Sequence, residues 1–169
     1  MRYLQEMCQI VAITPLAQGV YDMMLSAPAI AGKAKAGQFV HILCGEHLLR
    51  RPISIAGFQP ETGTLRLVFE VRGQGTKWLS ERSVGQSLDI LGPLGHGFPL
   101  LDKSKKVVLV GGGIGTPPLL PVAQHYGENA TVITGFRHQA ACILQQDFAA
   151  AGASTILCTD DGSAGFHGF

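Results

Sequence analysis

The stretch Lys106-Val107-Val108-Leu109-Val110-Gly111-Gly112-Gly113-Ile114-Gly115-Thr116-Pro117-Pro118 decides the fold, because it joins a strand to a glycine-rich turn and the start of a helix. Glycines let backbone amides approach a pyrophosphate closely, and the free N–H groups and positive dipole end of the helix face the phosphates. The two prolines stiffen the helix entrance. The turn favours a dinucleotide site, although glycine-rich loops also serve as plain tight turns. Its expected contacts are Gly111, Gly112, Gly113 and Gly115.

The chain around this turn alternates between strand and helix. Strands are expected over residues 107–110, 131–134 and 155–158, and helices over 118–126 and 139–151. This alternation predicts a parallel sheet with helical crossovers in a domain that covers residues 101–169.

The first hundred residues have a different pattern, in which short strand-like runs are separated by turn residues. The six runs predict a small antiparallel barrel over residues 1–100. They cover residues 8–13, 20–25, 39–43, 53–56, 65–71 and 87–91. The glycine- and proline-rich stretch 92–99 is expected to be neither helix nor central strand and to mark the domain boundary.

Two stretches of the barrel region could hold an anion. Arg51 opens the run Arg-Pro-Ile-Ser, and its planar guanidinium can donate two parallel hydrogen bonds to a phosphate. Gly75 and Thr76 precede a short helix expected over residues 77–81, where free amides and a hydroxyl suit a second phosphate contact. The simpler interpretations are a surface arginine paired with a carboxylate and a helix cap formed by Thr76. Arg50 is expected to point the other way, toward solvent or a partner subunit.

These motifs resemble those of the ferredoxin-reductase superfamily, in which a flavin-binding antiparallel barrel precedes a nicotinamide-nucleotide domain. Within it, the chain resembles the electron-transfer subunits of NAD-dependent dihydroorotate dehydrogenases. Five motifs carry this resemblance in order: Leu49-Arg50-Arg51-Pro52-Ile53-Ser54, Gly73-x-Gly75-Thr76-Lys77, Leu91-Gly92-Pro93-Leu94-Gly95-x-Gly97-Phe98, the triple-glycine turn, and Thr159-Asp160-Asp161-Gly162-Ser163.

The resemblance implies that the barrel binds FAD. Arg51 would hold the flavin diphosphate, and Ser54 would lie near flavin N5, unless its hydroxyl is bonded to the backbone. The position of Ile53 is aromatic in the wider superfamily, so the flavin ring would here pack on aliphatic surface. Val68 to Glu70 would supply backbone contacts, with core packing as the other role for Phe69. The residues expected at the flavin are Arg51, Pro52, Ile53, Ser54, Val68, Phe69, Glu70, Gly75 and Thr76.

The resemblance also implies NAD at the glycine turn. Thr159, Asp160 and Asp161 would then face the adenosine ribose, where two carboxylates repel a 2′-phosphate and accept hydrogen bonds from ribose hydroxyls. NAD is therefore expected rather than NADP. The alternative is a turn whose aspartates cap backbone amides.

Members of this family carry a 2Fe–2S cluster on cysteines of a C-terminal segment, and they work with an FMN-containing catalytic subunit. Here the cysteines are far apart and lack C-x-x-C spacing, so they are interpreted as buried thiols, and the six histidines show no metal-ligand spacing. No metal is expected on this chain, and its cluster ligands are expected to be missing. The four cysteines are Cys8, Cys44, Cys142 and Cys158.

Composition narrows the function classes further. A net charge of +1 with 15% charged residues gives no electrostatic reason for a nucleic-acid partner. No stretch approaches the roughly 18 apolar residues of a membrane helix, and the N-terminus lacks an apolar signal core. A cytoplasmic enzyme subunit is expected.

The predicted activity is electron transfer from dihydroorotate oxidation, through FAD, to NAD⁺ within a hetero-oligomer. No protein nucleophile is expected, since the cofactors carry the chemistry. The alternatives are a subunit of another NAD(P)H-linked reductase, of sulfide dehydrogenase or glutamate synthase type, and a non-catalytic barrel module. In related nicotinamide domains the first strand is central, so strand 107–110 is expected to present an unpaired apolar edge here, as in a truncated domain.

Overall fold

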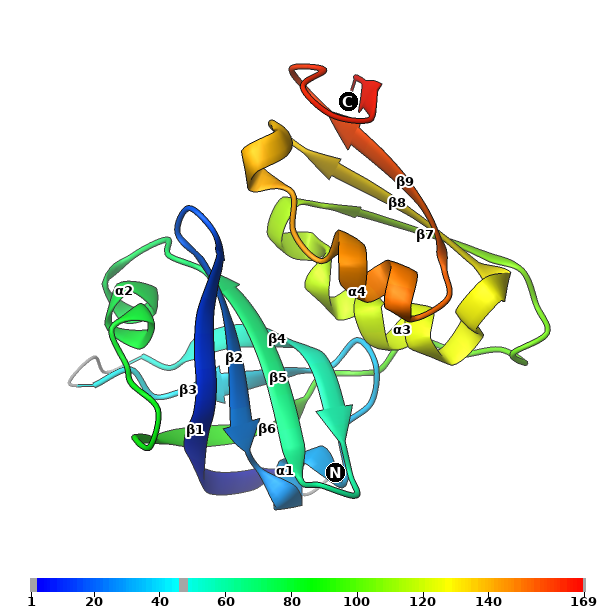
Figure 1. The fold of residues 1–169 in the computed structure, drawn as a ribbon. Helices are drawn as coiled ribbons and strands as arrows, with labels where there is room; N and C mark the ends of the chain where they lie inside the picture. Colours follow the sequence, from blue (N-terminus) through cyan, green and yellow to red (C-terminus); the bar gives the residue numbers. More distant parts are fainter. Residues whose placement is uncertain (1–2, 46–48, 169) are drawn as a thin grey trace. The chain divides into compact units, whose positions relative to one another are not determined.

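The computed structural model describes residues 3–45 and 49–168; His47, one of the six histidines, lies outside them. The chain divides into two compact units, Met1–Phe98 and Pro99–Phe169, and Figure 1 shows the elements of each. The division falls close to the boundary expected at residue 100.

Unit 1 is a closed six-stranded antiparallel barrel with the strand order β1-β2-β5-β4-β3-β6. Alternate strand residues point inward, and the core includes Ile10, Leu25, Ile55 and Leu67. The predicted barrel is therefore confirmed. Its elements are β1 (Leu4–Ala17), β2 (Val20–Ser26), α1 (Pro28–Ala31), β3 (Phe39–Ile42), β4 (Arg51–Gln59), β5 (Thr64–Glu70), α2 (Gln74–Ser80) and β6 (Ser87–Leu94).

Strand β6 continues through Pro93 to Leu94, so the expectation that residues 92–94 are not strand is wrong. The pairing of β3 with β6 is irregular between Phe39 and His41, opposite this segment. A proline is tolerated at such an irregularity because the ladder does not need its missing N–H. Gly92 fits for a second reason, since a Cβ there would lie 2.7 Å from Cγ1 of Val40.

Unit 2 contains a parallel sheet with the order β10-β9-β8-β7, and α3 and α4 lie on one of its faces (Figure 1). The predicted parallel-sheet fold is confirmed, but the helix expected over 139–151 is shorter. A 3-10 turn, Gln139–Ala141, is followed by Leu144 at φ 63°, and α4 begins only afterwards. The elements are β7 (Val107–Gly112), α3 (Leu120–Tyr126), β8 (Ala130–Phe136), α4 (Gln145–Ala150), β9 (Ser154–Thr159) and the unpredicted β10 (Phe166–His167).

Strand β7 lies at the edge of this sheet, as expected, and in the described part of the chain it pairs only with β8. Val108 and Val110 of β7 are 63% and 69% exposed. The register places Val110, Ile133 and Ile156 on the same face of the sheet, opposite the helices. The described unit therefore has an apolar edge and an apolar face.

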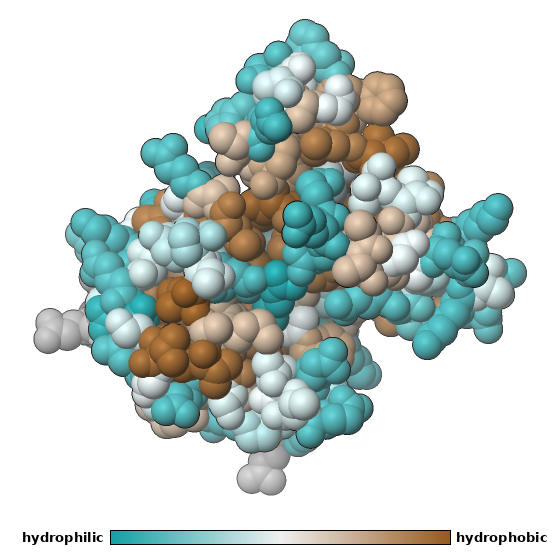
Figure 2. Space-filling view, in the orientation of Figure 1, coloured by the Kyte–Doolittle hydropathy of each residue, from teal (hydrophilic) through white to brown (hydrophobic). Residues whose placement is uncertain are grey.

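Apolar side chains also reach the surface of the barrel. Figure 2 shows them gathered over β1 and its neighbours, and Met7 and Val11 of β1 are largely exposed. Among the described helices, none has the length and apolar character required to cross a membrane.

The cysteines are all free, but only Cys8 and Cys44 are buried. Burial raises the pKa of the Cys8 thiol to about 12, and it also raises the pKa of Cys44. Cys142 and Cys158 are half-buried, so the interpretation of all four as buried thiols is wrong for these two.

Candidate functional site

A gap opens in the barrel wall between β4 and β5. The two strands pair only as far as Ile55 and Leu67; from there, the Arg51 end of β4 pairs with β3, while β5 continues to Glu70 beside β2. The N–H of Val71 donates to the carbonyl of Gly19 on the β2 side. Because successive residues of a strand direct their backbone N–H and C=O groups to opposite sides, those of Val68 and Glu70 point into the gap. Backbone groups without a strand partner are available to a ligand.

Arg51 lies at one end of this gap, directly against the start of α2. A Cβ added to Gly75 would lie 2.5 Å from Nε of Arg51, so any other residue there would displace the arginine from this position. Nη1 of Arg51 donates to the carbonyl of Leu49 at 2.8 Å, and no carboxylate of the described residues pairs with it. The structure therefore does not support the interpretation of Arg51 as an ion-paired surface residue.

The first turn of α2 is capped by Thr76. Its hydroxyl accepts hydrogen bonds from the N–H groups of Arg72 and Gly73 and donates to the carbonyl of Gly73. The first helical bond is donated by Lys77, which leaves the preceding amides of the turn without helix partners. The Thr76 hydroxyl thus shapes the turn, and the free amides beside Arg51 are the groups suited to an anion.

The other predicted flavin residues lie along the same gap with different exposures. Ser54 is half-buried, and its hydroxyl has no hydrogen-bond partner among the described residues, so a backbone-bonded serine is not observed. Ile53 is only 8% exposed and belongs to the barrel core, while Pro52 is exposed. Phe69 is buried and stacks on Tyr21, with ring centroids 5.7 Å apart, so its side chain packs the core.

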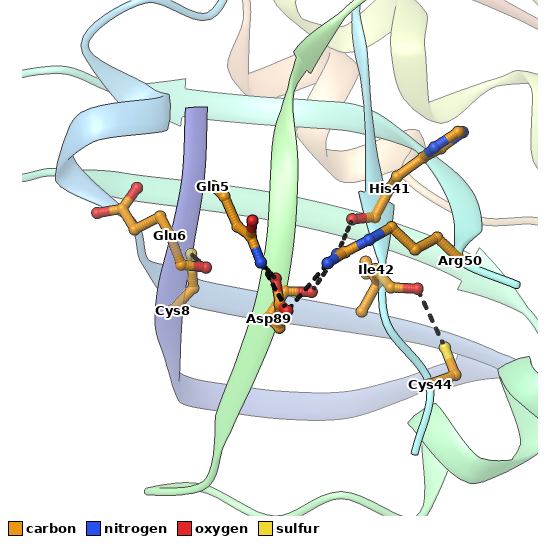
Figure 3. Close-up of polar contacts among 8 residues, drawn as sticks. All are labelled: Gln5, Glu6, Cys8, His41, Ile42, Cys44, Arg50 and Asp89. Carbon is orange, nitrogen blue, oxygen red and sulfur yellow. Dashed lines mark hydrogen bonds and ion pairs between the residues drawn. The ribbon is translucent and has the colours of Figure 1, made fainter. Parts of the chain in front are cut away.

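Arg50 is neither solvated nor free for a partner, contrary to the expectation. Its Nη2 lies 2.9 Å from Oδ2 of Asp89, and its Nη1 donates to the carbonyl of the same aspartate (Figure 3). Gln5 donates to both carboxylate oxygens of Asp89 from β1. The adjacent arginines therefore differ in role, because Arg50 joins the segment before β4 to β6 and β1 while Arg51 faces the gap.

The glycine turn of unit 2 has the geometry of a close strand-to-helix connection. Gly111 permits the approach of the helix, since a Cβ there would lie 2.7 Å from Leu119. Gly113 has φ +50°, and the space around Gly115 is open. The buried hydroxyl of Thr116 is the one buried side-chain polar atom of the described residues without a hydrogen-bond partner.

The Thr159–Asp161 segment lies at the same carboxyl edge of the sheet, where open α/β sheets bind ligands. Thr159 is buried, and its hydroxyl donates to the carbonyl of Ala164 at 2.7 Å. Asp161 accepts from the N–H and hydroxyl of Ser163, and these bonds lower its pKa. Of the two aspartates in this segment, Asp160 is the one whose exposed carboxylate has no side-chain partner among the described residues.

Sequence reasoning missed three residues near these sites. Arg72, just before the Gly73–Thr76 turn, is exposed and pairs with Glu70 at 2.7 Å beside the gap. A basic residue next to a glycine-rich turn is the signal that could have identified it. Arg137 follows β8 at the sheet edge and is exposed. Tyr21 is identified only by the pairing of β2 with β5, which places it opposite Phe69.

Curated proteins match this sequence along most of its length. A comparison with models of protein families gave no match. The electron transfer subunit of dihydroorotate dehydrogenase B (NAD(+)) from Shouchella clausii is 40% identical, covering 100% of this chain and 68% of its own. The subunit of the same name from Geobacillus thermodenitrificans is 38% identical, with coverages of 97% and 66%.

Solved structures agree with this result. An NADH-dependent reduced ferredoxin-NADP oxidoreductase is 32% identical with a TM-score of 0.86, over 96% of this chain and 60% of that one. A ferredoxin reductase of carbazole 1,9a-dioxygenase, 21% identical, has a TM-score of 0.84 over 100% of this chain and 55% of its own, and supports the fold alone.

Fold and site together define a ferredoxin-reductase-like flavin oxidoreductase subunit of the FAD- and NAD-binding type. The chain spans about two thirds of the length of the curated relatives. It belongs to the family of electron transfer subunits of dihydroorotate dehydrogenase B (NAD(+)).

Proposed function

We propose that the barrel binds FAD in the gap between β4 and β5, with the diphosphate held by Arg51 and the first turn of α2. The observation that carries this proposal is the contact of Arg51 with Gly75, which sets an unpaired guanidinium beside free helix amides. Such charge-assisted, partly bidentate bonds are the strong ones for phosphate. The backbone groups of Val68 and Glu70 suit the polar edge of the flavin, and the unpartnered hydroxyl of Ser54 can donate to a ring nitrogen.

Glycines 111–115 and the carboxyl edge of the unit 2 sheet are proposed to bind NAD. The open space at Gly115 and the left-handed Gly113 leave backbone amides accessible to a pyrophosphate. Asp160 is proposed to accept hydrogen bonds from the adenosine ribose and to repel a 2′-phosphate, while Thr159 and Asp161 hold the loop in shape. Bound FAD supplies hydride exchange with the nicotinamide, and the residues named here bind and orient the two nucleotides.

The whole protein is proposed to act as the electron-transfer subunit of a cytoplasmic dihydroorotate dehydrogenase, in complex with an FMN-containing catalytic subunit that oxidises dihydroorotate. The names and identities of the curated relatives support this assignment. The described residues contain no group of three or more His, Cys, Asp or Glu that could hold a metal, so no step is assigned to a cluster on this chain.

Flavin analysis and stopped-flow spectroscopy test the proposal. The chain should purify with FAD, identified by chromatography after denaturation, and NADH should bleach the flavin absorbance. FMN as the bound flavin, or a preparation that binds no flavin when FAD is added, would contradict the assignment of the gap.

A related reductase subunit is the second candidate function, favoured by the 32% identity to the NADH-dependent ferredoxin-NADP oxidoreductase. Isolation of the native complex distinguishes the two. An FMN-containing partner with dihydroorotate-dependent NAD⁺ reduction supports the first candidate, and a partner active with ferredoxin instead supports the second.

A further inference from the structure

A second basic site lies on the barrel, in a pocket of about 350 Å³ beside the end of α1. Besides Gln38, four side chains with polar donors line it, and no Asp or Glu does. Neither lysine has an ion-pair partner among the described residues, and the carboxylate of nearby Glu6 is occupied by the amides of Ala29 and Ile30. The four donors are Tyr3, Lys33, Lys35 and His96.

Two loops form this pocket, and hydrogen bonds hold them together. Gln38 is only 6% exposed; its Oε1 accepts from the N–H of Lys35 at 2.9 Å, and its Nε2 donates to the carbonyl of Gly95 at 2.9 Å. The N–H of Phe98 donates to the carbonyl of Ala36 at 2.8 Å. The backbone carrying Lys35 is thus fixed relative to that carrying His96, so ligand binding need not order these loops.

We propose that this pocket binds a small phosphorylated molecule of about the size of a sugar phosphate. Its volume lies within the range of about 300–1,000 Å³ usual for small-molecule sites. Ammonium groups act as point charges toward phosphate, and Lys33 and Lys35 bring two of them to one pocket. The imidazole of His96 and the phenol of Tyr3 add further donors.

The pocket is distinct from the proposed diphosphate cradle and does not depend on the proposed function, although the carbonyl of its residue Gln38 accepts from the N–H of Ile55, where the gap begins. Its lining shares no residue with the cradle of Arg51 and Gly75, and Figure 1 shows α1 and α2 at different ends of the barrel. The phosphorylated ligand is therefore additional to FAD.

Titration of the 169-residue chain with ribose 5-phosphate, in phosphate-free buffer, tests the proposal by calorimetry and by amide NMR shifts. Saturable binding is expected, with shifts at Gly95, His96 and Gly97. The double variant Lys33→Met/Lys35→Met should lose at least about tenfold in affinity, on the scale of one charge-assisted hydrogen bond. Lys103→Met/Lys105→Met is the matched control, because these exposed lysines have the same spacing and lie outside the pocket; it should change the affinity less than twofold.

Several outcomes would overturn the site. These are the absence of saturable binding, equal losses in the two double variants, or a loss caused by Arg51→Gln instead, which would place the phosphate in the flavin gap. Citrate that competes as strongly as ribose 5-phosphate would show that the pocket does not select phosphate. Equal binding of unphosphorylated ribose would show that it does not select anions.

Discussion

At the scale of single residues, two adjacent arginines show how register assigns function. The guanidinium of Arg50 forms an ion pair with Asp89. Among the described residues, that of Arg51 is hydrogen-bonded only to backbone carbonyls and lies against Gly75. We therefore expect Arg51→Ala to weaken FAD binding by roughly 1.5–3 kcal/mol, the range for a charge-assisted hydrogen bond. Quenching of Trp78, the one tryptophan of the chain and a residue of α2, provides the binding measurement.

Arg51→Lys is the informative companion, because it keeps the charge and loses the planar fork; its affinity should lie between those of the wild type and Arg51→Ala. Lys105→Ala, an exposed change in unit 2, should leave FAD affinity unaltered. Full FAD affinity in folded Arg51→Ala would show that the phosphate role belongs elsewhere.

The two aspartates after β9 differ in the same way. Asp160→Asn should narrow the preference for NADH over NADPH, measured as the ratio of flavin reduction rates, since it removes the unoccupied carboxylate. Asp161→Asn should mainly loosen the loop, because this carboxylate binds the N–H and hydroxyl of Ser163. Equal rates with both nucleotides in the unmutated protein would contradict the assignment of Asp160.

At the scale of elements, α2 is both a structural helix and part of the proposed FAD site. A substitution at Gly75 should affect these two roles differently. Alanine favours a helix over glycine by up to about 1 kcal/mol, so Gly75→Ala should not lower thermal stability. Its Cβ would nevertheless displace the Arg51 side chain, and FAD affinity should fall. Calorimetry and flavin titration give the two readouts.

Gly73→Ala is the matched control, since a Cβ there meets nothing within 4 Å. It should retain FAD affinity. If both alanine variants lose affinity equally, the loss comes from the altered turn and not from Arg51.

At the scale of the whole molecule, we expect the open edge of β7 to control association in solution. An unpaired strand edge bearing exposed valines is a template for association. The 169-residue chain should therefore self-associate, and Val108→Lys/Val110→Lys should increase the monomer fraction seen by light scattering. Met7→Lys/Val11→Lys is the control: these exposed apolar residues belong to β1 of the barrel and not to the edge strand β7, so this change should affect association less.

Much of the fold could be predicted from local patterns. The barrel strands follow from short apolar runs between turns, and the sheet of unit 2 follows from strand and helix alternation after the glycine turn. The prediction failed at β6 and at the helix expected over 139–151. The proline in β6 lies opposite an irregular pairing with β3, which is distant in the sequence, and a leucine at φ 63° interrupts the expected helix.

The sequence by itself determined the class of the chain, because the glycine turn and the motif residues around Arg51 and Gly75 are local and specific in chemistry. The tertiary structure decided which members of those motifs are free. Some side chains are hydrogen-bonded within their own loops, namely those of Thr76, Thr159 and Asp161. The charged groups of Arg51 and Asp160 have no such side-chain partner in the described part of the chain and remain available to a ligand. The physical reason is that a hydrogen-bonding group already satisfied within the fold has little left for a ligand, and that satisfaction depends on neighbours that only folding brings together.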